Sequence, residues 1–360
     1  MNKGGFTKNC LYALALFYGI TGEPAFAQSL PSDKTITDKT IEDEAKESVR
    51  KSDEKNYISV SIENDLIGGG TDQYYTSGLR LSYFNVNTDY PPVFDTIADA
   101  IPTFDLNETT STYFTIGQNI YTPDDITIAA PQSDDRPWAG FLYGSVGLLT
   151  LEDNHVDELE FTLGVVGPES LAENTQKFVH KHLSDSPKPR GWDNQLGFEP
   201  GLILSAQRRW PRVIDADIGD YYLRAEPNIN ASIGNIYTYA GAGLGFSFGP
   251  DDDIIEDRPP RVRPAMPGSG YFDTPDRNWS WSIFAGVDGR AVARNIFLDG
   301  NTFKDSPSVD KKPLVADFTA GLTTTLDRYR IAYSINKRTE EFDGQNGDSV
   351  FGSVTFSTRF

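Results

Sequence analysis

The chain ends on Ser349-Val350-Phe351-Gly352-Ser353-Val354-Thr355-Phe356-Ser357-Thr358-Arg359-Phe360, and this stretch decides the fold class. In an extended chain, one face would carry Val350, Gly352, Val354, Phe356, Thr358 and Phe360. The other face would carry mostly Ser349, Ser353, Thr355, Ser357 and Arg359. A period of two is the pattern of a β-strand. We therefore predict a final strand with one apolar and one polar face.

The same alternation recurs through the chain, most clearly at Ile58–Ile62, Leu79–Tyr83 and Trp279–Val287. Strands with one face toward lipid and one toward water are typical of membrane-spanning barrels, in which a strand needs only about 10 residues. A soluble β-sandwich would show the same alternation, but the double tryptophan of the third segment and the terminal aromatic residue favour the barrel. We therefore predict an all-β protein, a transmembrane antiparallel β-barrel of a bacterial outer membrane.

Twelve or thirteen segments follow this pattern. They lie near residues 57–64, 76–86, 111–121, 137–150, 156–166, 197–209, 214–230, 232–248, 278–291, 293–303, 312–336 and 348–360. The segment 312–336 is read as a hairpin that turns at Asp327-Arg328 and counts as two strands. Because single-chain bacterial barrels have an even number of strands, we predict about twelve.

Residues 1–27 have the features of a secretory signal peptide. Lys3 and Lys8 precede an apolar run at 11–20, and small residues then set a cleavage site before Gln28. No other apolar stretch approaches the roughly 18–20 residues of a spanning helix, which excludes an inner-membrane protein. The expected location is therefore the outer membrane.

The predicted domain division has three parts. The signal peptide (1–27) is followed by a polar N-terminal extension (28–56), to which we assign no function, and by the barrel domain (57–360). The only cysteine, Cys10, would be removed with the signal peptide. The mature chain would then have no disulfide and no cysteine metal site.

The formal net charge of −20 argues against nucleic acid as a partner, because a phosphate-binding protein needs a basic face. This charge suits acidic loops, some of which could hold divalent cations. The acidic, proline-rich stretch from Pro250 to Pro275 is interpreted as a long loop. Within it, Asp251-Asp252-Asp253 is interpreted as a solvated turn rather than a calcium site.

One segment breaks the period of two. From 170 to 183 the apolar residues recur at helical spacing, and a capping box would open the helix at Ser170 and Glu173. On a helix with about 100° per residue, Glu173 shares a polar stripe with Gln176 and His180. A barrel has little use for a helix unless the helix builds a site. Gln176 and His180, one turn apart, are therefore candidate site residues.

The chain has three histidines, His155, His180 and His182. Histidine is the natural general base near neutral pH, since its unperturbed pKa of about 6.5 is closest to that task. His180 is the candidate base because it lies beside Gln176. His182 falls on the opposite stripe with Leu171 and Phe178, so it is interpreted as a packing residue.

Oxygen-bearing side chains gather around the first strand connection. Glu63-Asn64-Asp65 ends the first strand, a glycine run follows at 68–70, and Thr71–Gly78 opens the second strand. Such ligands on either side of a short connection can hold Ca²⁺, which takes 6–8 oxygens at about 2.3–2.6 Å. Asn, Asp and Gly also make ordinary turns. Strict alternation would turn Asp65 toward the lumen and Asn64 outward, so Asn64 could contribute only if the strand bends there.

Seven short segments stand in a characteristic order between the first strand and about the sixth. They are Glu63-Asn64-Asp65, Thr71-Asp72 with Tyr75-Thr76-Ser77-Gly78, Gly117-Gln118-Asn119-Ile120-Tyr121-Thr122-Pro123, Asp135-Arg136-Pro137-Trp138-Ala139-Gly140, Gly164-Val165-Val166-Gly167-Pro168, Gln176-x-x-x-His180 and Gly191-Trp192-Asp193-Asn194-Gln195. As a set they resemble the family of outer-membrane lipid A 3′-O-deacylases. Beyond about Gln195 the chain is a generic barrel.

The resemblance implies a twelve-stranded barrel whose active site lies between the wall and a helix. It implies hydrolysis of the ester of the 3′-linked acyloxyacyl chain of lipopolysaccharide with Ca²⁺ as cofactor. His180 would be the base that activates water, with Gln176 supporting it. Asn64, Asp65 and Thr76 would line the calcium and oxyanion region. The expected partners are lipid A and outer-membrane lipids, and we expect the chain to act as a monomer.

This chain departs from the family at one place and leaves two alternatives open. Family members carry a Lys-Arg pair where this chain has Ile126-Thr127-Ile128-Ala129-Ala130, so Lys181, Lys188 or Arg190 would have to contact a lipid phosphate instead. The first alternative is an outer-membrane phospholipase with Ser170 as nucleophile and His180 as base. The second is a barrel pore or structural protein without enzymatic activity.

Overall fold

The computed structural model describes residues 40–43, 55–68, 74–86, 104–182, 184, 186–250, 259, 261–262, 268–272, 275 and 278–360. Several sequence predictions lie outside these residues. They are the signal peptide at 1–27, most of the extension at 28–56, Gly69 and Gly70 of the glycine run, Thr71-Asp72 and Asp251-Asp252-Asp253.

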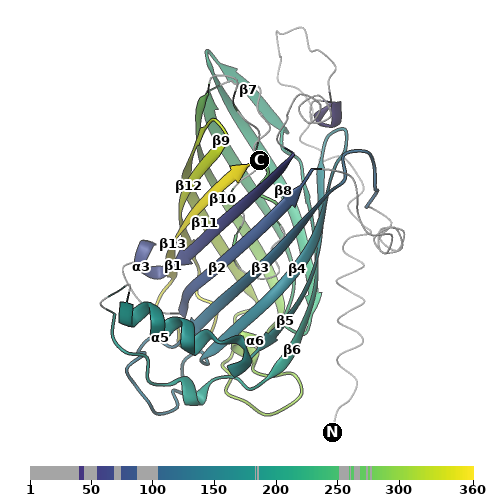
Figure 1. The fold of residues 1–360 in the computed structure, drawn as a ribbon. Coiled ribbons are helices and arrows are strands. Elements are labelled where there is room, and N and C mark those ends of the chain that lie inside the picture. Colours follow the sequence, from purple (N-terminus) through teal and green to yellow (C-terminus); the bar gives the residue numbers. More distant parts are fainter. Residues whose placement is uncertain are drawn as a thin grey trace.

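The described strands form one antiparallel sheet that closes on itself (Figure 1). The strands are β1 (Asn56–Asn64), β2 (Tyr74–Asn85), β3 (Ser111–Thr122), β4 (Ala139–Leu151), β5 (Val156–Val166), β6 (Glu199–Arg209), β7 (Ile214–Ile218), β8 (Tyr221–Gly234), β9 (Tyr237–Pro250), β10 (Trp279–Asn295), β11 (Leu314–Leu326), β12 (Tyr329–Arg338) and β13 (Ser349–Arg359). Most strands pair with their neighbours in sequence, and β1 pairs with β13. The pairing of β6 with β8 completes the barrel.

Twelve strands make the closed wall, as predicted. The strand β7 pairs only with β8, and its register continues that of β6 beyond the irregular residues 210–213. Thus β6 and β7 behave as one bent strand, because bulges bend a strand without adding a new one to the sheet. The prediction of an antiparallel barrel of about twelve strands is confirmed.

The wall turns its apolar residues outward. In β13 Val354 and Phe356 are exposed, whereas Ser353, Thr355 and Arg359 are buried. The same alternation runs along β12 from Tyr329 to Arg338. In a soluble β-sandwich the apolar faces would be buried between two sheets. The outward apolar surface therefore favours the barrel in a lipid environment.

Two predicted strand boundaries are wrong, and the errors cancel in the count. The segment 214–230 contains the β7–β8 turn, where Gly219 has φ 68°, a conformation that glycine adopts without strain. The predicted strand 293–303 is absent from the structure, because β10 ends at Asn295 and helix α6 (Ile296–Asp299) begins. The Asn295 side chain caps this helix by accepting a hydrogen bond from the Phe297 amide at 3.1 Å. The hairpin turn at Asp327-Arg328 is confirmed.

The connection between β9 and β10 folds into the barrel lumen. Its described residues 261–262 and 268–272, named here the plug segment, bond to inward-facing side chains of the wall. Tyr57 donates its hydroxyl to the Ser269 carbonyl at 2.6 Å, and Arg359 donates to the Phe272 carbonyl. Phe272 is fully buried. The stretch predicted as a long loop is therefore, in its described part, an interior segment.

The helices that connect the strands of the wall gather at one end of the barrel (Figure 1). They are α3 (Asp65–Gly68), the 3-10 turn η1 (Pro168–Ser170), α5 (Ala172–His182), the 3-10 turn η2 (Trp192–Asn194) and α6. The chain termini of the barrel, Asn56 and Phe360, lie at the opposite end and exchange two backbone hydrogen bonds of 3.1 and 2.8 Å.

Among the residues described, no helix combines the length and the apolar character that crossing a bilayer requires.

Replacement of Phe360 by alanine is expected to lower the yield of assembled barrel. The Phe360 side chain is half-exposed on the outer face of the barrel and points away from the lumen. Its loss would therefore leave the folded wall intact. The measurement is the fraction of protein that shows the heat-dependent gel shift of a folded barrel. Phe356→Ala is the matched control, because Phe356 is an outward phenylalanine of the same strand. Equal yields for both variants would contradict a special role of the last residue.

Candidate active site

Helix α5 lies against the outside of the barrel wall. Ile120 is an outward residue of β3, yet it is buried. It packs in an apolar cluster with Ile126, Trp138, Ala172 and Trp192. Gly140 allows this close approach: a Cβ atom there would lie 2.2 Å from both the Ala172 Cβ and the Ser170 Oγ. The helix therefore covers the outer face of β3 and β4, and the predicted helix is confirmed.

The helix turns Gln176, the middle residue of the predicted polar stripe, toward the wall. Gln176 is buried, whereas Leu171 and Phe178 are about half-exposed on the opposite side. The ring of His182 stacks on Phe178 with centroids 4.9 Å apart, and His182 is exposed. His182 thus packs on Phe178, on the stripe where it was predicted, and this stripe faces away from the wall. A helix on the lipid side of a barrel can expose apolar side chains that a water-facing helix would bury.

The capping box predicted at Ser170 and Glu173 is wrong. The helix begins at Ala172, after η1 and a left-handed Leu171 with φ 59°. The Ser170 hydroxyl donates to the Gly167 carbonyl at 2.6 Å, and Glu173 pairs with Lys177 one turn further along. Tight backbone turns at Gly167 and Leu171 thus replace the side-chain cap that the spacing indicated.

Gln176 is held by a tryptophan that the site prediction did not include. The Trp192 indole donates to the Gln176 Oε1 at 2.8 Å, and the Trp192 ring packs on Trp138 with centroids 5.0 Å apart. The Gln176 Nε2 is buried and has no hydrogen-bond partner among the described residues. A buried donor without a partner is unfavourable unless a ligand completes it. The Gln176 Nε2 is thus the donor that remains unused in this cluster.

His180 lies one turn beyond Gln176 on the same helix. Its Nδ1 lies 2.7 Å from the Pro187 carbonyl oxygen, which can only accept, so this nitrogen is the donor. In the neutral imidazole the other nitrogen, Nε2, then carries the basic lone pair. The segment after α5 therefore fixes the tautomer that a general base requires.

On the outer face of the wall, a row of cross-strand neighbours leads from Asn64, in the predicted calcium region, to Gly140, which lies under the start of α5. Asn64 pairs with Ser77, Ser77 with Ile120, and Ile120 with Gly140. With strands about 4.8 Å apart, Asn64 lies roughly 14 Å from Gly140 along this row. His180 lies eight residues into the helix, or about 12 Å from its start over Gly140.

The strand bends at the place where the prediction required it. Asn64 is the last residue of β1, and Asp65 begins α3, which folds over Gly352 on the outer face of β13. The amide of Leu66 donates to the Oδ1 of Asn64 and to the Oδ1 of Asp65, each at 2.9 Å. The strict alternation that would turn Asp65 toward the lumen therefore ends at Asn64. Asn64 faces outward, which is the side on which α5 lies.

The oxygen donors expected for calcium are partly described. Asn64 and Asp65 supply an amide and a carboxylate oxygen, the donor chemistry that Ca²⁺ prefers. Thr76 lies in β2 at the irregularity between Tyr75 and Ser77, but its side chain lies outside the described part, as does Asp72. No group of three or more metal-binding side chains of the His, Cys, Asp or Glu type occurs among the described residues. The described donors fit calcium in kind, and the calcium site stays a prediction.

An acidic pocket lies between the β3–β4 and β12–β13 connections. It has a volume of about 320 Å³ and includes Asp124, Asp134, Asp135 and Asn346 in its lining. Burial, and then the neighbouring carboxylates of Asp135 and Asp125, raise the pKa of Asp124 above its ordinary value. The aspartates of this pocket thus repel one another.

The remaining candidates are placed as follows. Ser170 is fully buried and bonded to the Gly167 carbonyl. His155 lies in the β4–β5 turn at the other end, with Nε2 at 3.6 Å from Asp157. The backbone amide of Arg190 donates to the Ile126 carbonyl at 2.9 Å, which brings an exposed arginine beside the segment that lacks the Lys-Arg pair. Sequence spacing could not reveal this contact, because it joins two irregular segments.

Comparison with known proteins agrees with this architecture. The family model described as "Outer membrane protein LpxR" matches residues 11–360. The structure is similar to LpxR from Salmonella typhimurium, with a TM-score of 0.69 and 21% identity over 84% of this chain and 100% of that one. The β domain of the Bordetella autotransporter BrkA aligns with a TM-score of 0.41 and 9% identity over 86% and 100%. The comparison with curated proteins finds no match.

Proposed function

This chain belongs to the LpxR family of outer membrane proteins, and from that premise we propose that it is a calcium-dependent lipid A 3′-O-deacylase. One observation carries the proposal: α5 lies on the outer face of the wall with Gln176 buried against it, His180 one turn further along, and Asn64 facing the same outer side from the end of β1. A base on the membrane side of a barrel can meet an acyl ester without removing the lipid from the bilayer. The 3′ position and the acyloxyacyl chain rest on the resemblance in sequence.

The proposed mechanism begins with proton transfer. The Nε2 of His180 accepts a proton from water, and the water oxygen bonds to the ester carbonyl carbon. The Gln176 Nε2, which is buried without a partner, donates to the developing oxyanion. Breakage of the carbonyl carbon–oxygen ester bond releases the acyloxyacyl acid, and His180 returns its proton to the 3′-oxygen. When bound by Asn64, Asp65 and Thr76, Ca²⁺ would add Lewis-acid polarisation of the carbonyl.

The exposed side of α5 supports a lipid substrate. Leu171 and Phe178 are turned away from the wall, toward the place where acyl chains of the membrane would lie. The proposal is tested by mass spectrometry of lipid A from cells with and without this protein. Loss of the mass of the 3′-acyloxyacyl group is the expected result. An unchanged lipid A profile, with folded protein in the membrane, would refute the proposed activity.

A serine-nucleophile mechanism is disfavoured by the surroundings of Ser170. Its side chain is fully buried, and its hydroxyl donates to the Gly167 carbonyl rather than to His180. A nucleophile has to lie within hydrogen-bond reach of its base.

We therefore expect Ser170→Ala to retain activity. The variant loses one hydrogen bond, which costs about 1 kcal/mol of stability and leaves His180 unchanged. Deacylation by the purified, heat-shifting variant is measured beside the wild type. A folded Ser170→Ala protein without activity would instead support the serine mechanism.

The plug segment inside the barrel lumen argues against the pore alternative. The plug segment lies inside the barrel, where Tyr57, Arg80 and Arg359 donate hydrogen bonds to its carbonyl groups. A water-filled channel would need this space. Conductance in planar bilayers distinguishes the alternatives, since an open channel would give steady current and a filled lumen would not.

A further inference from the structure

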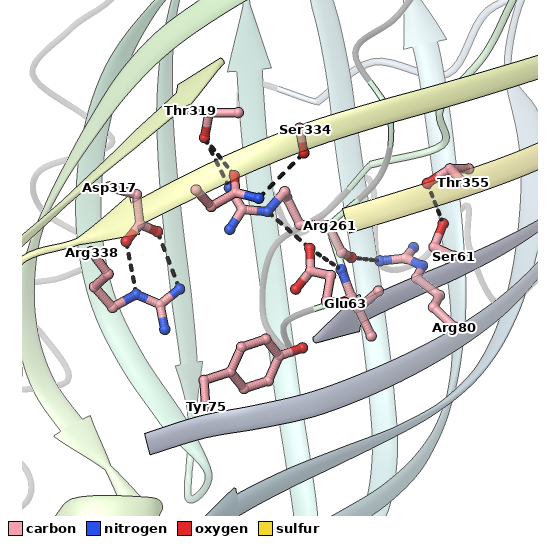
Figure 2. Close-up of polar contacts among 12 residues, drawn as sticks. Ser61, Glu63, Tyr75, Arg80, Arg261, Asp317, Thr319, Ser334, Arg338 and Thr355 are labelled. Atoms are coloured by element: carbon pink, nitrogen blue, oxygen red, sulfur yellow. Dashed lines mark hydrogen bonds and ion pairs between the residues drawn. The ribbon is translucent and has the colours of Figure 1, made fainter. Parts of the chain in front are cut away.

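The end of β1 is fastened from inside the barrel. Glu63 faces the lumen immediately before Asn64 and Asp65, and it is fully buried. Its Oε1 accepts hydrogen bonds from the Arg261 Nε and from the Val262 amide, each at 3.2 Å (Figure 2). Both donors belong to the plug segment. The strand end that carries the predicted site residues on its outer side is thus bonded to the plug segment on its inner side.

The tip of the plug segment consists of Arg261 and Val262. It is bonded to other strands independently of β1. The Val262 carbonyl accepts hydrogen bonds from the Asn119 side-chain Nδ2 at 3.2 Å and from the Tyr143 hydroxyl at 3.0 Å. Arg80 donates to the Arg261 carbonyl at 3.0 Å. These partners lie on β2, β3 and β4, so the tip provides a fixed frame against which Glu63 is held.

The same tip also reaches the second strand of the predicted site. Asn119 donates both to the Val262 carbonyl and, at 3.1 Å, to the hydroxyl of Tyr75. Tyr75 directly precedes Thr76. Gly78 leaves the room for this arrangement, since a Cβ atom there would lie 2.2 Å from the Tyr75 hydroxyl and 2.6 Å from the Val262 Cγ1.

Arg261 supplies the positive charge opposite Glu63. The other buried arginines of this region have carboxylates of their own: Arg80 pairs with Glu160 at 3.2 Å and Arg338 with Asp317 at 2.7 Å. Figure 2 shows Arg261 between Glu63 and Thr319, and the Arg261 Nη1 donates to the Thr319 hydroxyl at 3.3 Å. A buried carboxylate needs both a countercharge and hydrogen bonds. Without Arg261 the Glu63 side chain would have to move, and the end of β1 would move with it.

We propose that Arg261 and Glu63 are positioning residues of the active site: across the barrel wall, their ion pair holds Asn64 and Asp65 in the place that the reaction requires. This role rests on the proposed function. The plug segment would then do more than fill the lumen, because its tip would determine the position of Asn64 and Asp65 at the end of β1.

Hydrogen exchange of the Asn64–Gly68 amides tests the proposal without relying on activity. In Arg261→Gln, exchange of these amides is expected to be about tenfold to a hundredfold faster, the range that loss of one charge-assisted hydrogen bond produces. The Ca²⁺ concentration for half-maximal deacylation should rise in the same variant. Wild-type exchange and calcium dependence in a folded Arg261→Gln barrel would overturn the proposal.

Tyr57→Phe is the matched control. It removes the hydrogen bond between the same strand and the same plug segment at Ser269, but at the opposite end of β1. Exchange at Asn64–Gly68 and the calcium dependence should remain those of the wild type. Equal effects of Tyr57→Phe and Arg261→Gln would show a general loss of stability and overturn a positioning role.

A second variant keeps the test decisive if Arg261→Gln does not assemble. Arg261→Lys keeps the charge opposite Glu63 but loses the planar group that also reaches Thr319. A smaller acceleration of exchange at the same amides is expected, and none would overturn the proposal. If the wild type itself does not deacylate lipid A, the proposed function fails, while the exchange measurement still decides whether Arg261 holds the end of β1.

Discussion

Replacement of His180 by alanine is expected to lower the rate of lipid A deacylation by roughly 10²–10⁴, the usual contribution of a positioned general base. The structure gives a reason for a loss of this size. The Pro187 carbonyl at 2.7 Å fixes the donor nitrogen of the ring, and Gln176 lies one turn away on the same helix. Release of the 3′-acyloxyacyl chain by purified, heat-shifting protein is the measurement.

His182→Ala is the control for this experiment. The two histidines are two positions apart on one helix, yet His182 is exposed and stacks on Phe178. Its replacement should change the rate little. Equal rates for the wild type and His180→Ala would refute the mechanism, and an equal loss in both variants would indicate damage to α5.

Replacement of Asp65 by alanine is expected to abolish the calcium-dependent activity and leave the barrel folded. Asp65 is the first residue after β1, so it contributes none of the ladder hydrogen bonds that hold the wall. A carboxylate contributes both charge and oxygen ligands to a calcium site, and alanine supplies neither. Deacylation is measured against added Ca²⁺, and folding by the heat-dependent gel shift.

Asp134→Ala controls for the loss of one negative charge at the same end of the barrel. Asp134 is exposed in the β3–β4 connection and should be dispensable. Chelation provides the complementary experiment: wild-type protein in excess chelator should lose activity and regain it when Ca²⁺ is restored. Full activity in chelator would disprove the calcium assignment.

The barrel could be predicted because its alternation is local. Each outward residue of β13, such as Val354 or Phe356, is recognised from its immediate neighbours, so the strand is visible without knowledge of its partners. The boundaries at Gly219 and Asn295 were missed because a two-residue turn and a short capped helix interrupt an otherwise apolar pattern only briefly. The predicted number of twelve strands is still correct, but the predicted strand boundaries in these two regions are not.

The site could be predicted only in part, since helical spacing finds a stripe but not the side on which it packs. Gln176 and His180 were found from the period of α5, yet a soluble protein would have buried Phe178 instead. The contact of Trp192 with Gln176 joins α5 to an irregular segment beyond it. The ion pair of Glu63 with Arg261 joins residues nearly 200 positions apart, within a stretch that reads as an ordinary proline-rich loop. No local pattern encodes such contacts.

The outward placement of α5 also bears on how a substrate would arrive. Because Gln176 faces the wall and Phe178 faces away from it on the lipid side, the proposed site would open onto the plane of the membrane. A lipid embedded in that plane searches for the site by lateral diffusion in two dimensions. Under the proposed function, the concentration that governs turnover would be the mole fraction of lipid A in the leaflet or in a mixed micelle, so added detergent would slow deacylation by surface dilution alone.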